Sequence, residues 1–375
     1  MRRSLAFERP EANVRALLII IILGVGGWFG GRALGWFGGT ESQAPESKSG
    51  AKAPSVQAKS TPPVSPAPTP SVDEREAKAA ADLARAKADA EAETKAIADG
   101  ITAIADGRPV DRSRLEAIAA RSADTVARDS ARAEIDATST DAWTKWIALS
   151  RLYTGGRGAP GDRAKLYAAV LEAAKGAFRA PGARESTIDY TVAAGDALAK
   201  ICDRYRKDPG LALTPGELRW VNGLRGDLIR VGQTLKIPKV PTSIQVSKGS
   251  FRLRLLIGDG LVREYPVAIG RENKTPAATF TVQHMLVKAP WKDPVSGQLI
   301  HFGEPGYAIG TRWIGFEDTA DASGLGIHGT NDPASIGTAA SLGCIRLANE
   351  NVEELFDLVP AGTKVTITDA KWPGY

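Results

Sequence analysis

The sequence predicts a multidomain protein with an N-terminal transmembrane helix, an Ala-rich α-helical region, a small βααβ module and a C-terminal, mainly-β domain. The composition of the 375-residue chain changes sharply several times, as expected for a chain longer than one typical domain. Its middle is rich in strong helix formers. Its last third alternates apolar and polar residues between short turn sequences, which is the pattern of β-strands.

Charge and cysteine content exclude several classes of function. The net charge is only +5, and Lys and Arg are interspersed with Asp and Glu, so we expect no nucleic-acid partner. The two cysteines form at most one bridge, and no CxxC or CxxH spacing is present for structural zinc. We therefore predict neither a metal site nor a cofactor.

The N-terminal sequence predicts a basic cytoplasmic tail, residues 1–15, followed by a transmembrane anchor, residues 16–37. The run from residue 16 to 31 carries no charge. It reaches the ~20 residues of a membrane span if Arg32 extends toward the interface. Four arginines precede this run, so the positive-inside rule places the N-terminus in the cytoplasm. We expect a single-pass inner-membrane protein whose folded part, including the C-terminal domain, lies in the periplasm.

Two alternatives to an anchor are a cleaved signal peptide and twin-arginine export. The nearest small-x-small cleavage pattern, Ala51-Lys52-Ala53, lies well beyond the apolar run, which disfavours cleavage. The pair Arg2-Arg3 is the basis of the export alternative.

Residues 38–72 are rich in Pro, Ser and Ala and predict an extended linker. The α-helical region, residues 73–185, begins with a capping-box pattern at Ser71 and Glu74. Within it Trp143, Trp146 and Ile147 share one helix face, which predicts a small bundle that packs its own core. A binding surface for an unknown protein partner is the alternative. Nothing in this region indicates a particular chemistry.

Residues 186–239 form a separate pattern of two short strands around two helices. We expect a first strand at residues 190–192, a helix capped by Asp196 that runs to Tyr205, and a second helix capped by Thr214. A second strand at residues 233–237 completes the module, and Pro238 ends it.

This βααβ order resembles the lysin motif (LysM), a family of modules that binds N-acetylglucosamine-containing glycans such as peptidoglycan. The resemblance covers nearly the whole segment, and its matching positions are Tyr190, Val192, Gly195, Asp196, Leu198, Ile201, Asn222, Gly232, Leu235 and Pro238. It implies that Gly195, Asp196 and Asn222 contact glycan. Ala197 replaces the usual Ser or Thr beside the first turn, so a module without glycan affinity is the alternative. Cys202 is expected to be a buried, inert thiol.

Residues 240–375 predict an antiparallel β domain that, like the module before it, has enough sequence to fold alone. Turn sequences at Lys248-Gly249 and Asp259-Gly260 separate three alternating runs, which predicts two hairpins. One helix is expected near the end, capped by Asn349 and stopped by Pro360, before a last strand at residues 363–367.

His328 and Cys344 lie in this domain in a segment rich in Gly, Ser and Thr. A free thiol has a pKa near 8.5, so a neighbouring imidazole that accepts its proton and the nearby Arg346 would raise the thiolate fraction. Gly343, next to the cysteine, would let backbone N–H groups approach a developing oxyanion. These residue types together suit acyl transfer.

The pieces YPVAIG, TPAATFTV, IHGT, SLGCIRLANENVEEL and VPAGTKVTI closely resemble the L,D-transpeptidase catalytic domain (YkuD type) over about residues 242–368. The resemblance implies that Cys344 is the nucleophile and His328 the general base. It further implies that the Gly329 carbonyl orients the imidazole and that the Gly343 and Cys344 amides bind the oxyanion.

The same resemblance implies that Arg346, Ser341 and Thr330 contact the substrate. Alternatively, Arg346 forms a structural ion pair and Ser341 caps the loop. Leu342 stands where many members have a second histidine, so this position supplies no proton relay. His284 and His301 have no motif around them.

The implied reaction belongs to peptidoglycan biosynthesis, and thus to cell-wall biogenesis and cell shape. Cys344 would attack the tetrapeptide stem, release D-alanine and pass the acyl group to an amine. The acceptor stays open among a neighbouring stem, which gives a 3-3 cross-link, water and a protein lysine. Peptidoglycan glycan strands and stem peptides are the expected partners, together with the inner membrane.

Two rival interpretations remain at this point. In a zinc peptidase, His328, Cys344 and His284 or His301 would be the ligands, although close pairs such as HxxxH are absent. In a non-catalytic wall tether, a disulfide between Cys202 and Cys344 would remove the nucleophile.

Overall fold

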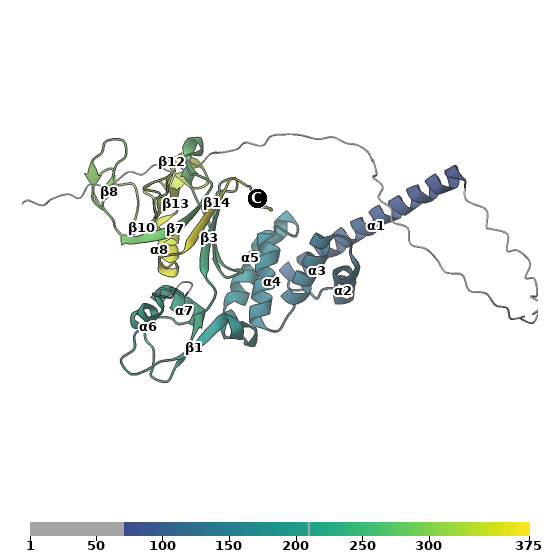
Figure 1. Cartoon of the computed structure of the whole chain (residues 1–375), viewed down its shortest axis with the longest axis horizontal. Helices are drawn as coiled ribbons and strands as arrows, with labels where there is room; N and C mark the ends of the chain where they lie inside the picture. Colours follow the sequence, from purple (N-terminus) through teal and green to yellow (C-terminus); the bar gives the residue numbers. More distant parts are fainter. Residues whose placement is uncertain (1–70, 209–210) are drawn as a thin grey trace, which may run out of the picture. The chain divides into compact units, whose positions relative to one another are not determined.

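The computed structural model describes residues 71–208 and 211–375 (Figure 1). The basic tail, the transmembrane anchor and nearly all of the linker predicted above lie outside these residues. Among the described helices, none is both long and apolar enough to span a bilayer.

The region after the linker is helical, as predicted. It contains α1 (Val72–Ala105), α2 (Arg112–Arg121), α3 (Thr125–Ala137), α4 (Ala142–Thr154) and α5 (Arg163–Ala174). The capping box at Ser71 and Glu74 is present, and it explains why the 34-residue α1 begins there. The first half of α1 is exposed, whereas Ile101 near its end is buried in the main core.

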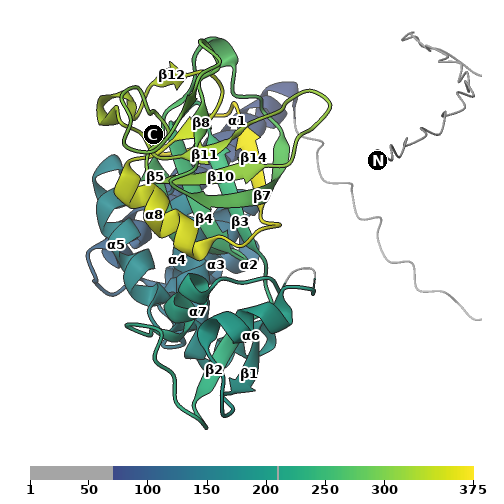
Figure 2. The same ribbon diagram turned by 90° about the vertical axis from the view of Figure 1, so that its left-hand side faces the viewer.

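The helices pack against the C-terminal sheet as well as against each other. The expectation of a bundle with only its own core was therefore wrong. Trp146 of α4 is fully buried in one core that continues into the C-terminal sheet. Its indole N–H donates to the Leu261 carbonyl at 3.0 Å. A Cβ built on Gly260 would lie 2.1 Å from the Trp146 ring, so the missing side chain makes room for the indole. Gly260 and Leu261 belong to β5 (Gly260–Pro266), and Figure 2 shows α4 and α5 next to this strand.

The βααβ module has the predicted order. Strands β1 (Thr187–Thr191) and β2 (Thr234–Pro238) pair antiparallel around α6 (Leu198–Tyr205) and α7 (Pro215–Asn222). Thr214 caps α7 as expected. Asp196 does not cap α6, whose N-cap is Ala197. The Asp196 carboxylate instead accepts hydrogen bonds from the Tyr190 hydroxyl at 2.6 Å and the Ala193 N–H at 2.8 Å.

The module contacts the C-terminal domain through α7 and α8 (Asn349–Leu358), which lie next to each other in Figures 1 and 2. The Thr214 hydroxyl donates to the Asp357 carbonyl at the end of α8. A Cβ on Gly216 would lie 2.2 Å from that carbonyl oxygen, so the glycine permits the close approach. Glu217, which is buried, accepts a hydrogen bond from the Thr242 hydroxyl at 2.5 Å.

The C-terminal domain is built on an eight-stranded sheet in the order β13-β11-β10-β7-β14-β3-β4-β5. Besides β5, its strands are β3 (Thr242–Ser247), β4 (Arg252–Ile257), β7 (Thr279–Val287), β10 (Arg312–Phe316), β11 (Gly326–His328), β13 (Ile345–Arg346) and β14 (Lys364–Thr368). Two small two-stranded sheets lie outside it. One is formed by β6 (Ile269–Gly270) with β12 (Ala339–Ser341), and the other by β8 (Trp291–Lys292) with β9 (Leu299–Ile300).

The two predicted hairpins, β3–β4 and β4–β5, are confirmed. A purely antiparallel sheet is not, because β14 pairs parallel to β3 and β13 pairs parallel to β11. The partners of each parallel pair are joined by long connections, which local turn sequences do not reveal.

The helix before the last strand also differs in one detail. Its N-cap is Ala348, so Asn349 is the first helical residue and does not cap it. The Asn349 amide instead donates to the Thr330 carbonyl at 3.0 Å and accepts from the Thr311 N–H at 3.2 Å. Helix α8 is thereby tied to the segment that follows His328.

Candidate active site

Parallel pairing of β11 and β13 brings His328 and Cys344 into one site. The register aligns Ile327 with Ile345 and His328 with Arg346. Cys344 comes directly before β13, so it lies at the end of the strand next to the one that carries His328. Two residues separated by a long loop in the sequence thus become neighbours through backbone pairing.

Both side chains line a cavity of about 300 Å³. Ser341 and Arg346 line it too, so four of the predicted site residues meet there. The remaining lining residues are Trp291, Lys292, Pro294, Ala308, Ile309, Trp313, Ser323, Gly324, Leu325 and Leu342.

His328 is held as a neutral base. Its Nδ1 lies 2.6 Å from the Gly329 carbonyl oxygen, and because a carbonyl only accepts, Nδ1 carries the hydrogen and Nε2 the free lone pair. Burial lowers the pKa of His328 to about 4; the Gly329 carbonyl opposes this shift and Arg346 adds to it. The Trp313 ring, on the paired strand β10, stacks on the imidazole at 5.7 Å between centroids.

Cys344 rests as a protonated thiol. Burial raises its pKa to about 11, although the Gly326 N–H and Arg346 act in the opposite direction. The sulfur lies 3.7 Å from the Gly324 carbonyl oxygen, a contact in which the thiol is the donor. We expected Arg346 to raise the thiolate fraction. Its influence has that sign, but the loss of solvation is larger.

The turn before Cys344 is fixed by Ser341 and Gly343. The Ser341 hydroxyl donates to the Cys344 carbonyl at 2.5 Å and accepts from the Gly343 N–H at 3.1 Å. Gly343 has φ of +143°, which a residue with a side chain rarely adopts. Because the Gly343 N–H donates to Ser341, this amide is already engaged in the structure. The oxyanion role of the Cys344 amide stays a prediction.

Arg346 and Thr330 have different surroundings. Arg346 lines the cavity, and its buried Nε finds no hydrogen-bond partner among residues 71–208 and 211–375. Thr330 is buried and does not line the cavity. Its hydroxyl accepts from the Asp332 N–H at 3.0 Å, so it shapes the turn after His328.

The residues predicted to contact glycan lie in the βααβ module, apart from this cavity. Gly195 is an exposed turn residue with φ of +83°. Asn222 is buried, and its side chain joins α7 to β2 through hydrogen bonds with the Leu218 carbonyl and both backbone groups of Lys236. The polar groups of Asp196 and Asn222 are thus engaged within the module.

The rival readings find little support in the part of the chain that the structure describes. No three His, Cys, Asp or Glu side chains converge there to hold a metal ion. His284 and His301 are exposed and do not line the cavity. Cys202 and Cys344 are both free, and Cys202 lies in the core of the module, where burial raises its pKa to about 12.

Sequence reasoning missed the wall of the cavity that comes from residues 288–313. Trp291 and Lys292 come from β8 of the β8–β9 hairpin, Ile309 from the segment after that hairpin, and Trp313 from the start of β10. No motif marked them. The only signal was two tryptophans in a segment otherwise rich in turn residues.

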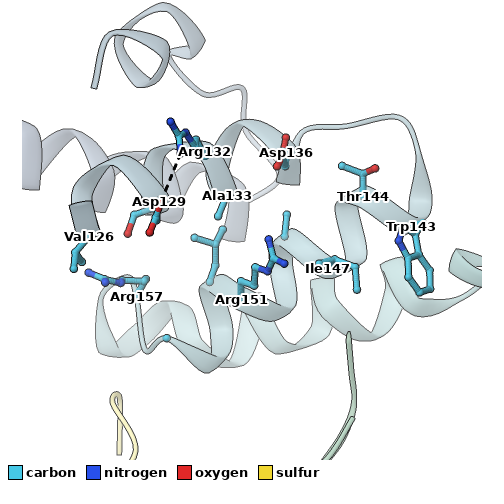
Figure 3. Close-up of a pocket in the computed structure, with 14 residues that line it drawn as sticks. Val126, Asp129, Arg132, Ala133, Asp136, Trp143, Thr144, Ile147, Arg151 and Arg157 are labelled. Atoms are coloured by element: carbon cyan, nitrogen blue, oxygen red, sulfur yellow. Dashed lines mark ion pairs between the residues drawn. The ribbon is translucent and has the colours of Figure 1, made fainter. Parts of the chain in front are cut away.

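Larger hollows lie elsewhere and carry no comparable chemistry. One of about 760 Å³ runs between α3 and α4 and is lined by residues that include Asp129 and Arg132 of α3 and Ile147 and Arg151 of α4 (Figure 3). Another of about 870 Å³ lies between the βααβ module and the end of α8. Neither contains His328 or Cys344, so the smaller cavity is the candidate active site.

The chain is similar to known proteins over its last two modules. A family model described as the L,D-transpeptidase catalytic domain (YkuD) matches residues 241–367, and a LysM domain model matches residues 190–238. YkuD of Bacillus licheniformis is 34% identical over 186 residues, which cover 48% of this chain and 98% of that protein. YkuD of Bacillus subtilis is 32% identical over 187 residues, with 48% and 98% covered. YqjB of Bacillus subtilis is 39% identical over 127 residues, with 33% and 69% covered.

The fold and the sequence together place the chain in a class of multidomain enzymes that act on the cell wall. The chain belongs to the YkuD family of L,D-transpeptidases, and a LysM domain precedes its catalytic domain.

Proposed function

We propose that this chain is a membrane-anchored cell-wall L,D-transpeptidase in which the Cys344 thiol is the nucleophile. The observation that carries the proposal is the pairing of β11 with β13, which puts a thiol and a neutral imidazole in one cavity. A neutral imidazole with a free Nε2 is a base that can accept the thiol proton as sulfur attacks.

The reaction follows from these protonation states. Sulfur of Cys344 attacks the amide carbonyl carbon before the terminal D-alanine of a tetrapeptide stem, while the thiol proton passes to Nε2 of His328. The imidazolium then protonates the amine of D-alanine as the C–N bond breaks, which leaves a thioester. An acceptor amine attacks that thioester, gives its proton to His328 and restores the thiol.

Two groups beside the sulfur suit the charges that develop. The Cys344 amide is the candidate donor to the oxyanion, since the Gly343 amide is engaged with Ser341. Arg346, with an unsatisfied buried Nε, is suited to bind the carboxylate of the D-alanine leaving group.

The other modules would hold this site at the wall. The apolar segment at residues 16–37 would anchor the chain in the inner membrane, with the catalytic domain in the periplasm. The LysM domain would bind glycan strands and raise the effective concentration of stem peptides near Cys344.

Covalent trapping tests the nucleophile. A carbapenem, which resembles the acyl donor of this family, should add once to the purified chain, as intact mass would show. Cys344→Ala should abolish the adduct and His328→Ala should slow its formation at least a hundredfold, in line with loss of a general base. Cys202→Ala is the matched control and should react like the wild type. An adduct that persists in Cys344→Ala contradicts the proposal.

A further inference from the structure

The charged side chains that line the candidate catalytic cavity are all positive. Of the residues that line it, Arg346 and Lys292 carry positive charges and none carries a carboxylate. The two cations come from different elements, since Arg346 belongs to β13 beside the nucleophile and Lys292 to β8 in the hairpin wall. A cavity with this lining favours a ligand that brings more than one negative charge.

Among the described residues, no acidic side chain pairs with Lys292 to neutralise its charge. In the described ranges its ammonium group makes neither a hydrogen bond nor an ion pair. The nearest acid in the sequence, Asp293, is engaged in its own turn, where its carboxylate accepts from the Val295 N–H, the Ser296 N–H and the Ser296 hydroxyl. The lysine therefore stays available to a ligand.

The hairpin that carries Lys292 is attached to the site. Trp291 and Trp313 both pack against a small buried cluster that includes Ile300 and Tyr307, and Trp313 in turn stacks on His328. The Tyr307 hydroxyl donates to the Ala289 carbonyl at 2.7 Å, and the Asn331 amide donates to the Tyr307 carbonyl at 2.9 Å. These contacts join the hairpin to the segment after His328, so the backbone that carries Lys292 is connected to the candidate active site, while the lysine side chain itself is exposed.

We propose that Lys292 selects acyl donors with a free carboxylate on the acyl part of the stem, in addition to the D-alanine carboxylate. The inference rests on the proposed function and adds the class of donor to it. Arg346, two residues from Cys344, is the cation assigned above to the D-alanine carboxylate, which leaves Lys292 for a second carboxylate. Two positions of a tetrapeptide stem offer one: the α-carboxylate of the second residue and a side-chain carboxylate of the third.

Matched donors distinguish these two sources. Four soluble tetrapeptides would carry both carboxylates, a carboxamide at position two, a carboxamide at position three, or both carboxamides. The full chain should show a kcat/KM about two- to fivefold lower for the carboxamide at the position that Lys292 contacts, as a charge-assisted hydrogen bond to an exposed lysine implies. The other single carboxamide should change kcat/KM less than twofold.

Variants assign the preference to the side chain. Lys292→Met should lose the discrimination, because its kcat/KM should fall about two- to fivefold on the preferred donor alone. Lys292→Arg should restore it. Lys288→Met is the control, because it removes the same charge from a lysine that lies over the Phe302 ring and does not line the cavity. The wild-type preference should weaken as salt is raised, since a partly exposed pair is screened.

The outcomes separate the two proposals. Equal turnover of all four donors by the wild type, or a uniform loss on all of them in Lys292→Met, overturns the role of Lys292 while the transpeptidase function stands. If no donor is turned over and no carbapenem adduct forms on Cys344, the proposed function itself fails, and the inference fails with it.

Discussion

The Cys344–His328 pair rests as two neutral groups. Burial disfavours the charged form of each, which raises the pKa of the thiol to about 11 and lowers that of the imidazole to about 4. A thiolate–imidazolium pair would have to form in a cavity that favours neither ion. In the mechanism proposed above, the proton therefore moves during attack on the carbonyl, as the negative charge develops on the carbonyl oxygen.

This resting state predicts an unusually broad pH profile. The rate of carbapenem acylation should be nearly constant from about pH 5 to about pH 10, because His328 stays neutral above its pKa of about 4 and Cys344 stays protonated below about 11. Below pH 4 the rate should fall about tenfold per unit as the base is protonated.

Stopped-flow or mass measurements in the Cys202→Ala background, with circular dichroism at each pH, would give this profile. A rate that falls steadily from pH 7 to pH 5 would instead indicate an ion pair that titrates near neutrality.

Local motifs were sufficient to single out residues that the structure brings together in one cavity, but not to predict the environment of those residues. Cys344, His328, Gly329 and Arg346 stand in one short stretch of recognisable spacing. Trp313 reaches His328 only because β10 pairs with β11, and this pairing leaves no local trace in the sequence. The pKa directions likewise depend on burial, which is a property of the folded chain.

At the scale of elements, strand β5 and helix α4 depend on each other. The Trp146 indole occupies the space that a side chain at position 260 would fill, and the Ser150 hydroxyl accepts from the Leu261 N–H at 3.0 Å. Hairpins such as β4–β5 were predictable because a two-residue turn sequence marks them. The packing of a helix more than a hundred residues earlier on that hairpin was not, because an amphipathic face does not specify its partner.

A single methyl group at this contact should be costly. Gly260→Ala places a Cβ 2.1 Å from the Trp146 ring, so the helix must shift, and overpacking of this kind costs about 1–3 kcal/mol. Urea unfolding followed by tryptophan fluorescence would measure the loss. Gly161→Ala is the matched control, since nothing lies within 4 Å of its Cβ. Equal midpoints for the two variants would mean that the contact contributes little.

At the scale of the whole molecule, the described modules are joined through buried contacts. The helical region shares its core with the catalytic sheet. The LysM domain touches the end of α8, and Asn349 at the start of α8 binds the Thr330 carbonyl next to the catalytic segment. The domain order was predictable from composition and motifs, whereas the expectation that residues 240–375 fold independently took no account of this shared core.

Truncation should therefore affect stability before it affects chemistry. A chain that begins at Pro241 retains Cys344, His328 and Lys292 but exposes the face of β5 that α4 and α5 cover. Trp146 alone buries a large aromatic surface there, and its loss in a core costs about 3–5 kcal/mol. We expect this chain to unfold at a much lower urea concentration than one that begins at Ser71.

A chain that begins at Ser186 isolates the cause, because it keeps the LysM domain and lacks the helices. It should be nearly as unstable as the chain that begins at Pro241, since the LysM domain does not cover β5. The fraction of either short chain that remains folded should still add a carbapenem at the rate of the longer chain, because no cavity residue lies upstream of residue 241. If the chain from Pro241 is as stable as the chain from Ser71, the catalytic domain folds alone and the helical region only rests on it.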